Sequence, residues 1–242
     1  MLAIRQIKTS RIREFAHDEP VETLVIMPST RMAQAQRAAR SMALRTRKNG
    51  LVIIAEDDCR LGFIPTANLV YAKTRSQFVA YVAQDAFPGF FWLEYAVDTM
   101  KKSGAGFVPF NDGLFFGKMA AFGLARREWL SSIYGNLLFY PRYTKHFGDV
   151  ELTDIARGTG SIAYEPHSIM MEVDYNRFLP DEEKAQPDGN RERSLPGERQ
   201  VQKDDSDGIL YVKRALTGFD GRIEPIVPVF GPVAEVINAL SS

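Results

Sequence analysis

Acidic side chains gather at two points of the sequence where they could bind a ligand. Glu56, Asp57 and Asp58 directly follow the apolar run 51–55, and Asp85 ends the run FVAYVAQD. Ligands of open α/β sheets bind at the carboxyl ends of strands. A carboxylate there can accept hydrogen bonds from a ribose or a base, or anchor a divalent cation beside substrate phosphates. A solvated loop at the triplet and a turn-forming aspartate at Asp85 are the structural alternatives.

A further pair of carboxylates lies where general acid–base chemistry could occur. Asp149 and Glu151 begin a segment, 149–157, whose apolar residues share one face and which is followed by Gly158. This pattern predicts a short helix. Either carboxylate could act as a general base. Negative charge is also favoured at a helix N-terminus for structural reasons alone, so both interpretations stay open.

The segments around these residues predict an α/β fold. A β-branched strand at 23–27, an amphipathic helix at 31–48 and an apolar strand at 51–55 make a βαβ unit, which implies parallel strands with a right-handed crossover. We therefore expect a single domain in which helices flank the sheet. Further strands are expected at 69–72, 77–83, 106–110, 114–123, 162–164 and 169–173, and further helices at 91–102 and 126–134.

The composition changes abruptly after the first 177 residues. Residues 178–208 are rich in charged residues, Gln, Pro and Gly and have almost no apolar anchor, which is typical of a mobile polar loop or a linker. Apolar residues return in 209–242, where a strand at 209–212 and a helix at 233–240 are expected. We expect this last segment to pack back on the domain formed by 1–177.

Composition and charge narrow the class of protein. The chain has 242 residues, of which 45% are hydrophobic and 25% are charged, and this suits one globular domain with a sizeable core. Its 30 basic and 30 acidic residues give a formal net charge of zero, so nothing global indicates a nucleic-acid partner. The single cysteine, Cys59, cannot form an internal disulfide. Because the N-terminus also lacks a leader-like apolar stretch, and no run approaches the roughly 20 apolar residues of a membrane span, we expect a cytoplasmic protein. Peripheral contact with a membrane stays open.

Several common site motifs are missing from the sequence. The three histidines, His17, His146 and His167, lack the close spacing of a zinc site, and one cysteine adds little to it. The sequence contains no GxxxxGK[ST] loop, no GxGxxG after a strand and no Gly-x-Ser-x-Gly elbow. P-loop, nicotinamide-dependent and serine-hydrolase chemistry are therefore disfavoured.

Taken in order, five segments within residues 22–175 resemble GT-A glycosyltransferases of the family 2 type. The resemblance implies a GT-A-like, Rossmann-related sheet that is mixed but mainly parallel. It also implies transfer of a sugar from a nucleotide-sugar donor to a hydroxyl acceptor, such as a glycan or a lipid-linked molecule, with inversion at the sugar centre and with the help of Mn²⁺ or Mg²⁺. The segments are VIMPSTR, IIAEDD, YVAQDAFPGFFWL, FGLARREWL and HFGDVELTDIARGTGSIAYEP.

The same resemblance implies roles for individual residues. Asp85 would bind the metal, completed by His167 or Glu172, while Asp149 would be the catalytic base, with Glu151 as the second candidate. The polar loop would close over the donor, and a plain linker is its alternative. The residues implied for the nucleotide sugar are Pro28, Thr30, Glu56, Asp57, Asp58 and Gln84.

The sequence departs from the family pattern at the metal site. Gln84-Asp85-Ala86 stands where the family usually has Asp-x-Asp, which leaves one carboxylate there. This departure favours one rival, a catalytically silent module that binds nucleotides or glycans. A nucleotidyltransferase on a related fold is a second rival, but MPSTRMAQ lacks the Gly-rich basic loop that such an enzyme needs after its first strand. Transfer onto an unusual acceptor such as modified DNA has no support from the neutral net charge.

Overall fold

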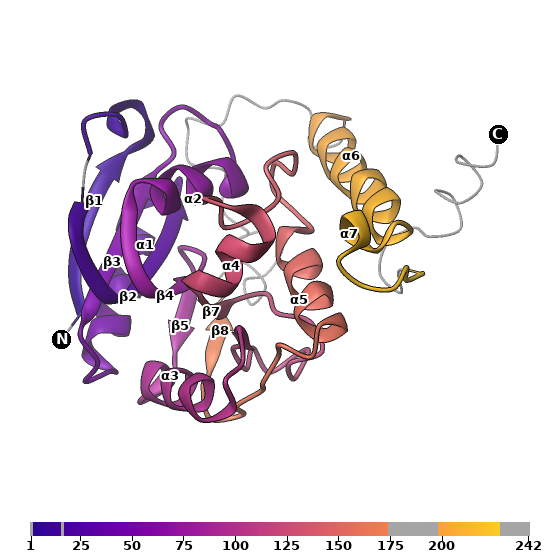
Figure 1. The fold of residues 1–242 in the computed structure, drawn as a ribbon. Coiled ribbons are helices and arrows are strands. Elements are labelled where there is room, and N and C mark those ends of the chain that lie inside the picture. The colour runs from indigo at the N-terminus through magenta and orange to yellow at the C-terminus, as the bar shows by residue number, and fades with distance from the viewer. Residues whose placement is uncertain (1, 16, 174–197, 228–242) are drawn as a thin grey trace, which may run out of the picture.

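A mixed six-stranded sheet forms the centre of the molecule (Figure 1). The computed structural model describes residues 2–15, 17–173 and 198–227. The strand order is β1-β3-β2-β4-β7-β6, in which only β7 runs against the other strands. The expected mainly parallel sheet is thus confirmed. The strands are β1 (Leu2–Lys8), β2 (His17–Ser29), β3 (Gly50–Glu56), β4 (Thr74–Tyr81), β6 (Phe107–Pro109) and β7 (Gly123–Arg126).

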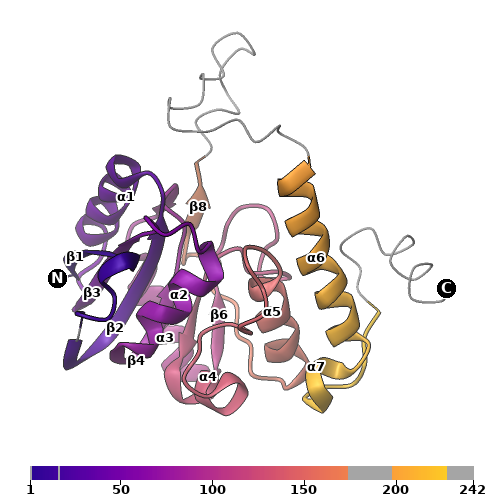
Figure 2. The same ribbon diagram turned by 90° about the horizontal axis from the view of Figure 1, so that it is seen from above.

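Helices cover both faces of this sheet (Figures 1 and 2). Successive residues of β2 point to opposite faces, so Leu24 and Ile26 pack in one core cluster while Val25 and Met27 pack in the other. Burial on both sides explains why the central strands are continuously apolar rather than alternating. The helices are α1 (Met32–Leu44), α2 (Phe63–Ala72), α3 (Trp92–Ser103), α4 (Arg127–Tyr134), α5 (Gly148–Gly158), α6 (Glu198–Ala215) and α7 (Gly218–Gly221), with a short 3-10 helix at Thr9–Arg11.

A small second sheet lies beside the main one. Strands β5 (Ala86–Pro88) and β8 (Met170–Glu172) pair antiparallel, with Ala86 opposite Glu172. The N–H of Val173 also donates to the carbonyl of Asp85, at 2.8 Å. Residues about 85 positions apart in the sequence therefore meet at the end of β4.

Three of the strands expected before residue 173 are wrong. One of them, 162–164, contributes only an isolated bridge between Ile162 and Phe107. Residues 69–72 form the last turn of α2. The prediction failed because a short, buried, apolar run has no periodicity that distinguishes a strand from a helix. Residues 114–122 form an irregular loop, and only Gly123 joins β7. Positive φ angles at Phe116 and Gly117 prevent an extended chain in that loop.

The C-terminal segment also differs from its expected structure. Residues 198–208, expected in the polar loop, begin α6, and 209–212 continue this helix instead of forming a strand. Tyr211, Val212 and Ala215 are buried against the core, so the apolar face of α6 explains why this stretch is helical. The remainder of the expected loop, 178–197, and the expected helix at 233–240 lie outside the described residues. Within the described part of the chain, no helix combines the length and apolarity that crossing a membrane requires.

Candidate functional site

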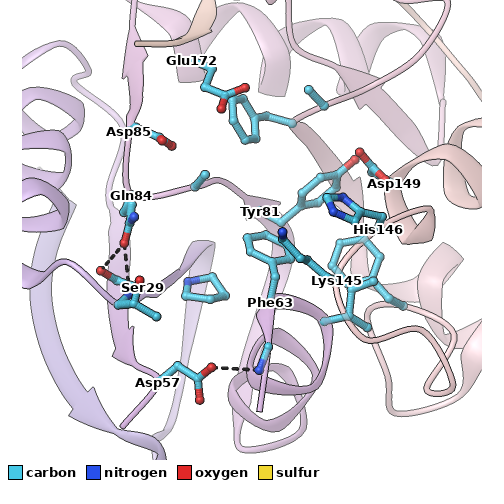
Figure 3. Close-up of a pocket in the computed structure, with 18 residues that line it drawn as sticks. Ser29, Asp57, Phe63, Tyr81, Gln84, Asp85, Lys145, His146, Asp149 and Glu172 are labelled. Carbon is cyan, nitrogen blue, oxygen red and sulfur yellow. Dashed lines mark hydrogen bonds between the residues drawn. The ribbon is translucent and has the colours of Figure 1, made fainter. Parts of the chain in front are cut away.

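A pocket of about 460 Å³ opens at the carboxyl ends of β2, β3 and β4 (Figure 3). The loop that precedes α5 and the end of β8 complete its wall. This is the place where open α/β sheets bind ligands, and the volume lies in the range of small-molecule sites. The lining residues are Pro28, Ser29, Thr30, Asp57, Gly62, Phe63, Ile64, Tyr81, Ala83, Gln84, Asp85, Ala121, Phe122, Phe139, Lys145, His146, Asp149 and Glu172.

Gln84 ties the end of β4 to the loop that follows β2. Its Oε1 accepts hydrogen bonds from the Ser29 hydroxyl at 2.9 Å and from the backbone N–H groups of Thr30 and Arg31, both at 3.0 Å. The Ser29 hydroxyl oxygen in turn accepts from the Arg31 N–H, at 3.0 Å. Gln84 therefore fixes the end of β2, which carries Pro28, and the following loop, which carries Thr30, along one edge of the pocket.

The acidic triplet after β3 does not act as one cluster. Asp57 lines the pocket, is 8% exposed, and accepts hydrogen bonds from the N–H groups of Leu61 and Gly62, both at 2.8 Å. Glu56 instead pairs with Lys8 of the neighbouring strand, at 3.7 Å. The split follows from the chain leaving the strand in a tight turn, which points successive side chains in different directions.

Asp58 points towards the N-terminal segment instead of the pocket. Its carboxylate accepts from the Thr9 hydroxyl at 2.7 Å and from the N–H and hydroxyl of Ser10 at 2.9 and 2.6 Å. The hydrogen bonds from Ser10, followed by the one from Thr9, hold the pKa of Asp58 well below its usual range. Asp57 is consequently the one member of the triplet that faces the cavity.

Asp85 and Glu172 lie together at one end of the pocket (Figure 3). The pairing of β5 with β8 brings them there. His167 lies elsewhere: its Nδ1 is 2.8 Å from Oε1 of Glu165, and its ring packs on Tyr95. The described residues include no group of three His, Cys, Asp or Glu side chains that could hold a metal ion. Two carboxylates still fit Mg²⁺ or Mn²⁺, since such ions commonly take one or two carboxylates and complete their shell with water and substrate phosphates.

Asp149 faces the same cavity from the first turn of α5 (Figure 3). Phe147, two residues before Asp149, has a left-handed backbone conformation with φ of 66°, and this turn leads the chain into α5. Burial raises the pKa of Asp149 to about 6, against the opposing effect of hydrogen bonds from its own N–H and that of Val150. The result is a carboxylate that is ionised at neutral pH and more basic than an ordinary aspartate.

Glu151 is fully buried on another side of α5 and does not line the pocket. Its carboxylate accepts hydrogen bonds from the hydroxyls of Tyr134 and Tyr143, at 2.7 and 2.6 Å. Arg214 of α6 adds two charged hydrogen bonds, at 2.8 Å from Nε and 2.7 Å from Nη2. These four bonds join α5 to α4, to the loop that carries Tyr143 and to α6. The Glu151 carboxylate therefore has a structural role, and Asp149 remains the candidate base.

Lys145 and His146 also line the pocket, although the sequence analysis predicts no ligand-binding role for either residue. Figure 3 shows the Lys145 side chain reaching towards the middle of the cavity, near Phe63 and Tyr81. The available signal was proximity to Asp149, which lies four and three residues further along the chain. That spacing carries little weight until the turn before α5 is known.

Comparison with known proteins defines the fold but leaves the function to be inferred. No protein-family model matches this chain, and no curated protein sequence matches it. Among solved structures, S. aureus TarS 1-349 has a TM-score of 0.50 and 12% identity over 84% of this chain and 83% of that chain. A longer TarS chain matches with the same TM-score and 11% identity, over 63% of this chain and 37% of its own. GalNAc-T7, solved with UDP, GalNAc and Mn²⁺, has a TM-score of 0.51 and 11% identity over 90% of this chain and 54% of that chain.

These similar structures are GT-A glycosyltransferases, and this chain therefore has the GT-A fold. The expected α/β class and its GT-A-like architecture are confirmed. The chain spans about a third of the longer TarS chain and about half of GalNAc-T7. At 11–12% identity the likeness extends to the fold and no further.

Proposed function

We propose that this protein is an inverting glycosyltransferase that moves a sugar from a nucleotide-sugar donor to a hydroxyl acceptor, assisted by Mn²⁺ or Mg²⁺. One observation carries the proposal. A single pocket at the strand ends joins a polar edge at Asp57, a carboxylate pair at Asp85 and Glu172, and a basic carboxylate at Asp149. A metal-assisted transfer with a general base uses these three functions side by side.

The nucleoside would lie along the edge formed by the ends of β2 and β3. Pro28, Ser29 and Thr30 line this edge, and Asp57 lies at its far end (Figure 3). The hydrogen bonds that backbone N–H groups donate to the side chains of Asp57 and Gln84 keep this edge in place before a ligand arrives. Pre-organisation of this kind lowers the cost of binding.

Asp85 and Glu172 would hold the divalent ion at the other end. When bound there, such an ion would neutralise negative charge on the donor diphosphate. Glu172 lies in β8 and Asp85 directly precedes β5, so the pairing of these two strands and the hydrogen bond from the N–H of Val173 to the carbonyl of Asp85 hold the two residues side by side. The sequence left His167 and Glu172 open as the second ligand, and the presence of Glu172 but not His167 in the pocket lining supports Glu172.

Asp149 would act as the general base. It would take the proton of the acceptor hydroxyl while that oxygen attacks the anomeric carbon and the bond to the diphosphate breaks. A pKa of about 6 leaves Asp149 mostly ionised at neutral pH and brings its basicity near the range that suits proton transfer. Attack in line with the departing diphosphate would invert the sugar centre.

The acceptor and the cellular location belong to the proposal as well. We propose a glycan or lipid-linked hydroxyl as acceptor. We also propose a cytoplasmic site of action, because Cys59 is the single cysteine of the sequence.

Nucleotide release from a panel of UDP-, GDP-, CDP- and dTDP-sugars tests this function, with Mn²⁺ or Mg²⁺ and with hydroxyl acceptors. Wild-type protein should release one nucleoside diphosphate. Asp149→Asn should bind the same donor but release the nucleoside diphosphate at least about 100-fold more slowly. Equal rates for the two proteins would remove Asp149 as the base.

A silent binding module is the second candidate, favoured by the pair, rather than trio, of carboxylates at the metal site. Tight nucleotide binding without release by wild-type protein, with any acceptor, would establish it instead.

A further inference from the structure

The pocket has a basic wall that faces its acidic one. Asp85 and Glu172 lie at one end of the cavity, while Lys145 reaches into it from the opposite side, with His146 next to it (Figure 3). Asp57 and Asp149 add two more carboxylates to the lining. A ligand as negative as a diphosphate would meet strong repulsion here unless cationic groups also contact it.

A buried carboxylate on α6 fixes the backbone of this basic wall. Asp207 is 2% exposed and accepts from the N–H of Thr144 at 3.1 Å to each of its oxygens, and from the Thr144 hydroxyl at 3.0 Å. It also accepts from the N–H groups of Lys145 and His146, at 2.9 and 3.1 Å. One side chain therefore holds three consecutive residues through charge-assisted hydrogen bonds, which are stronger than neutral ones.

The rest of α6 keeps Asp207 in register with α5. Tyr211 donates to Asp154 of α5 at 2.7 Å, and Arg214 pairs with the buried Glu151. Figure 2 shows α6 running beside α5. Helix α6 thus sets the position of the loop carrying Lys145 relative to the helix carrying Asp149.

We propose that Lys145, with His146 beside it, binds the diphosphate of the donor, and that Asp207 is the positioning residue for this cationic wall. The inference rests on the proposed function. During transfer, the bond between the anomeric carbon and the diphosphate oxygen breaks, and its electron pair stays on that oxygen. A new bond forms to the acceptor oxygen, whose proton passes to Asp149. The Lys145 ammonium group stabilises the charge left on the diphosphate.

A protein cation here complements a metal site with few ligands. Two carboxylates would balance the two positive charges of a divalent ion, so negative charge on the diphosphate remains for other groups to balance. Among the described residues that line the pocket, Lys145 is the one lysine or arginine. Asp207 also accepts a hydrogen bond from the backbone N–H of Lys145, so the position of the Lys145 main chain beside the cavity is fixed.

Calorimetric titration of UDP and uridine tests the assignment, both with Mn²⁺ and in EDTA. Lys145→Gln should weaken UDP binding about ten-fold or more, while uridine affinity stays within about two-fold of wild type, because only UDP carries the diphosphate. Lys102→Gln, which removes the same charge from an exposed position near the end of α3, is the matched control and should change neither affinity.

The outcomes separate the two levels of the inference. If the wild-type protein binds none of UDP, GDP, CDP and dTDP, the proposed function itself fails. If it binds UDP and Lys145→Gln binds UDP equally well, only the diphosphate assignment is overturned. A Lys145→Gln effect confined to the KM of an acceptor would also overturn it, by showing that the cation serves an anionic acceptor.

Asp207→Asn tests the positioning role by a readout that general stability does not move. It should lower UDP affinity about three-fold or more and leave uridine affinity unchanged, since loosening the backbone of the basic wall affects the diphosphate alone. Asp220→Asn, which alters an exposed partner of Arg214, is the control for an acid-to-amide change near α6. A lower melting temperature with an unchanged ratio of UDP to uridine affinity would reduce Asp207 to a structural residue.

Discussion

Replacing Asp149 by Asn should stabilise the protein while abolishing its activity. The pKa of Asp149 rises from 3.8 in the unfolded chain to about 6 in the folded protein, because the protein around this half-buried side chain removes part of the water that would solvate its charge. Below pH 3.8 the carboxyl is protonated in both states and costs nothing. As pH rises from 3.8 to 6 the unfolded chain releases its proton first, so stability is lost over this window and stays lost above it.

The size of the effect follows from the shift. Two units of pKa correspond to about 3 kcal/mol at pH 7.5, and the cost falls to about 1 kcal/mol at pH 4.5, where much of the folded protein is protonated. Asparagine removes the charge and keeps an oxygen that can accept the N–H of Val150. We therefore expect Asp149→Asn to raise the free energy of unfolding by up to about 3 kcal/mol at pH 7.5, with a gain about 2 kcal/mol smaller at pH 4.5.

Urea unfolding of both proteins at pH 4.5 and 7.5 measures this difference, and nucleotide release measures the activity. Asp98→Asn, at an exposed position of α3 paired with Lys48, is the control and should change stability by less than about 1 kcal/mol at either pH. A variant that is less stable than wild type at pH 7.5, or whose gain is the same at both pH values, would refute burial as the cause of the raised pKa.

Three further changes test the frame around the site. Glu151→Gln removes the buried charged partner of Arg214 and should cost about 3–5 kcal/mol of unfolding free energy, whereas Asp220→Asn, which removes the exposed partner of the same arginine, should cost at most about 1 kcal/mol. Similar losses in urea unfolding would contradict this difference in burial. Gly62→Ala forces a side chain onto a backbone with φ of 99° and to 2.6 Å from a neighbouring carbonyl oxygen, so calorimetry should show a loss of about 1–3 kcal/mol, and an unchanged melting temperature would argue against this geometry. Asp85→Asn combined with Glu172→Gln should abolish the part of nucleotide binding that depends on Mn²⁺ and retain the part measured in EDTA, and a persistent Mn²⁺ effect in titrations would place the ion elsewhere.

Much of the frame could be predicted from local patterns. Continuous apolar or amphipathic patterns predict the strands at 23–27 and 51–55 and the helix between them. Acidic residues that follow such a strand lie at the edge of a parallel sheet where ligands bind. The strand wrongly expected at 69–72 shows the limit of this approach. Its four apolar residues suit a buried strand and a buried helical turn equally well.

Which acid faces the pocket depended on contacts made far along the chain. Asp58 was indistinguishable from Asp57 in sequence, and its partners Thr9 and Ser10 lie almost 50 residues away. The separation of Asp149 from Glu151 was more accessible, because residues two apart on a helix do not share a face.

The basic wall illustrates the same limit at greater range. The link from Asp207 to Lys145 joins residues 62 positions apart, in a stretch that composition alone assigned to a polar loop. The burial of Asp207 depends on the packing of α6 on α5, which no local sequence pattern indicates.

Binding of nucleotides to the wild-type protein tests the central claim most directly. Thermal unfolding with UDP, GDP, CDP and dTDP, with and without Mn²⁺, is the measurement. One nucleoside diphosphate should stabilise the protein in a Mn²⁺-dependent way, by about 2.7 kcal/mol at 100 times its dissociation constant. If none of the four shifts the transition at millimolar concentration, with or without the metal, the pocket is not a nucleotide-sugar site and the proposed glycosyl transfer is wrong.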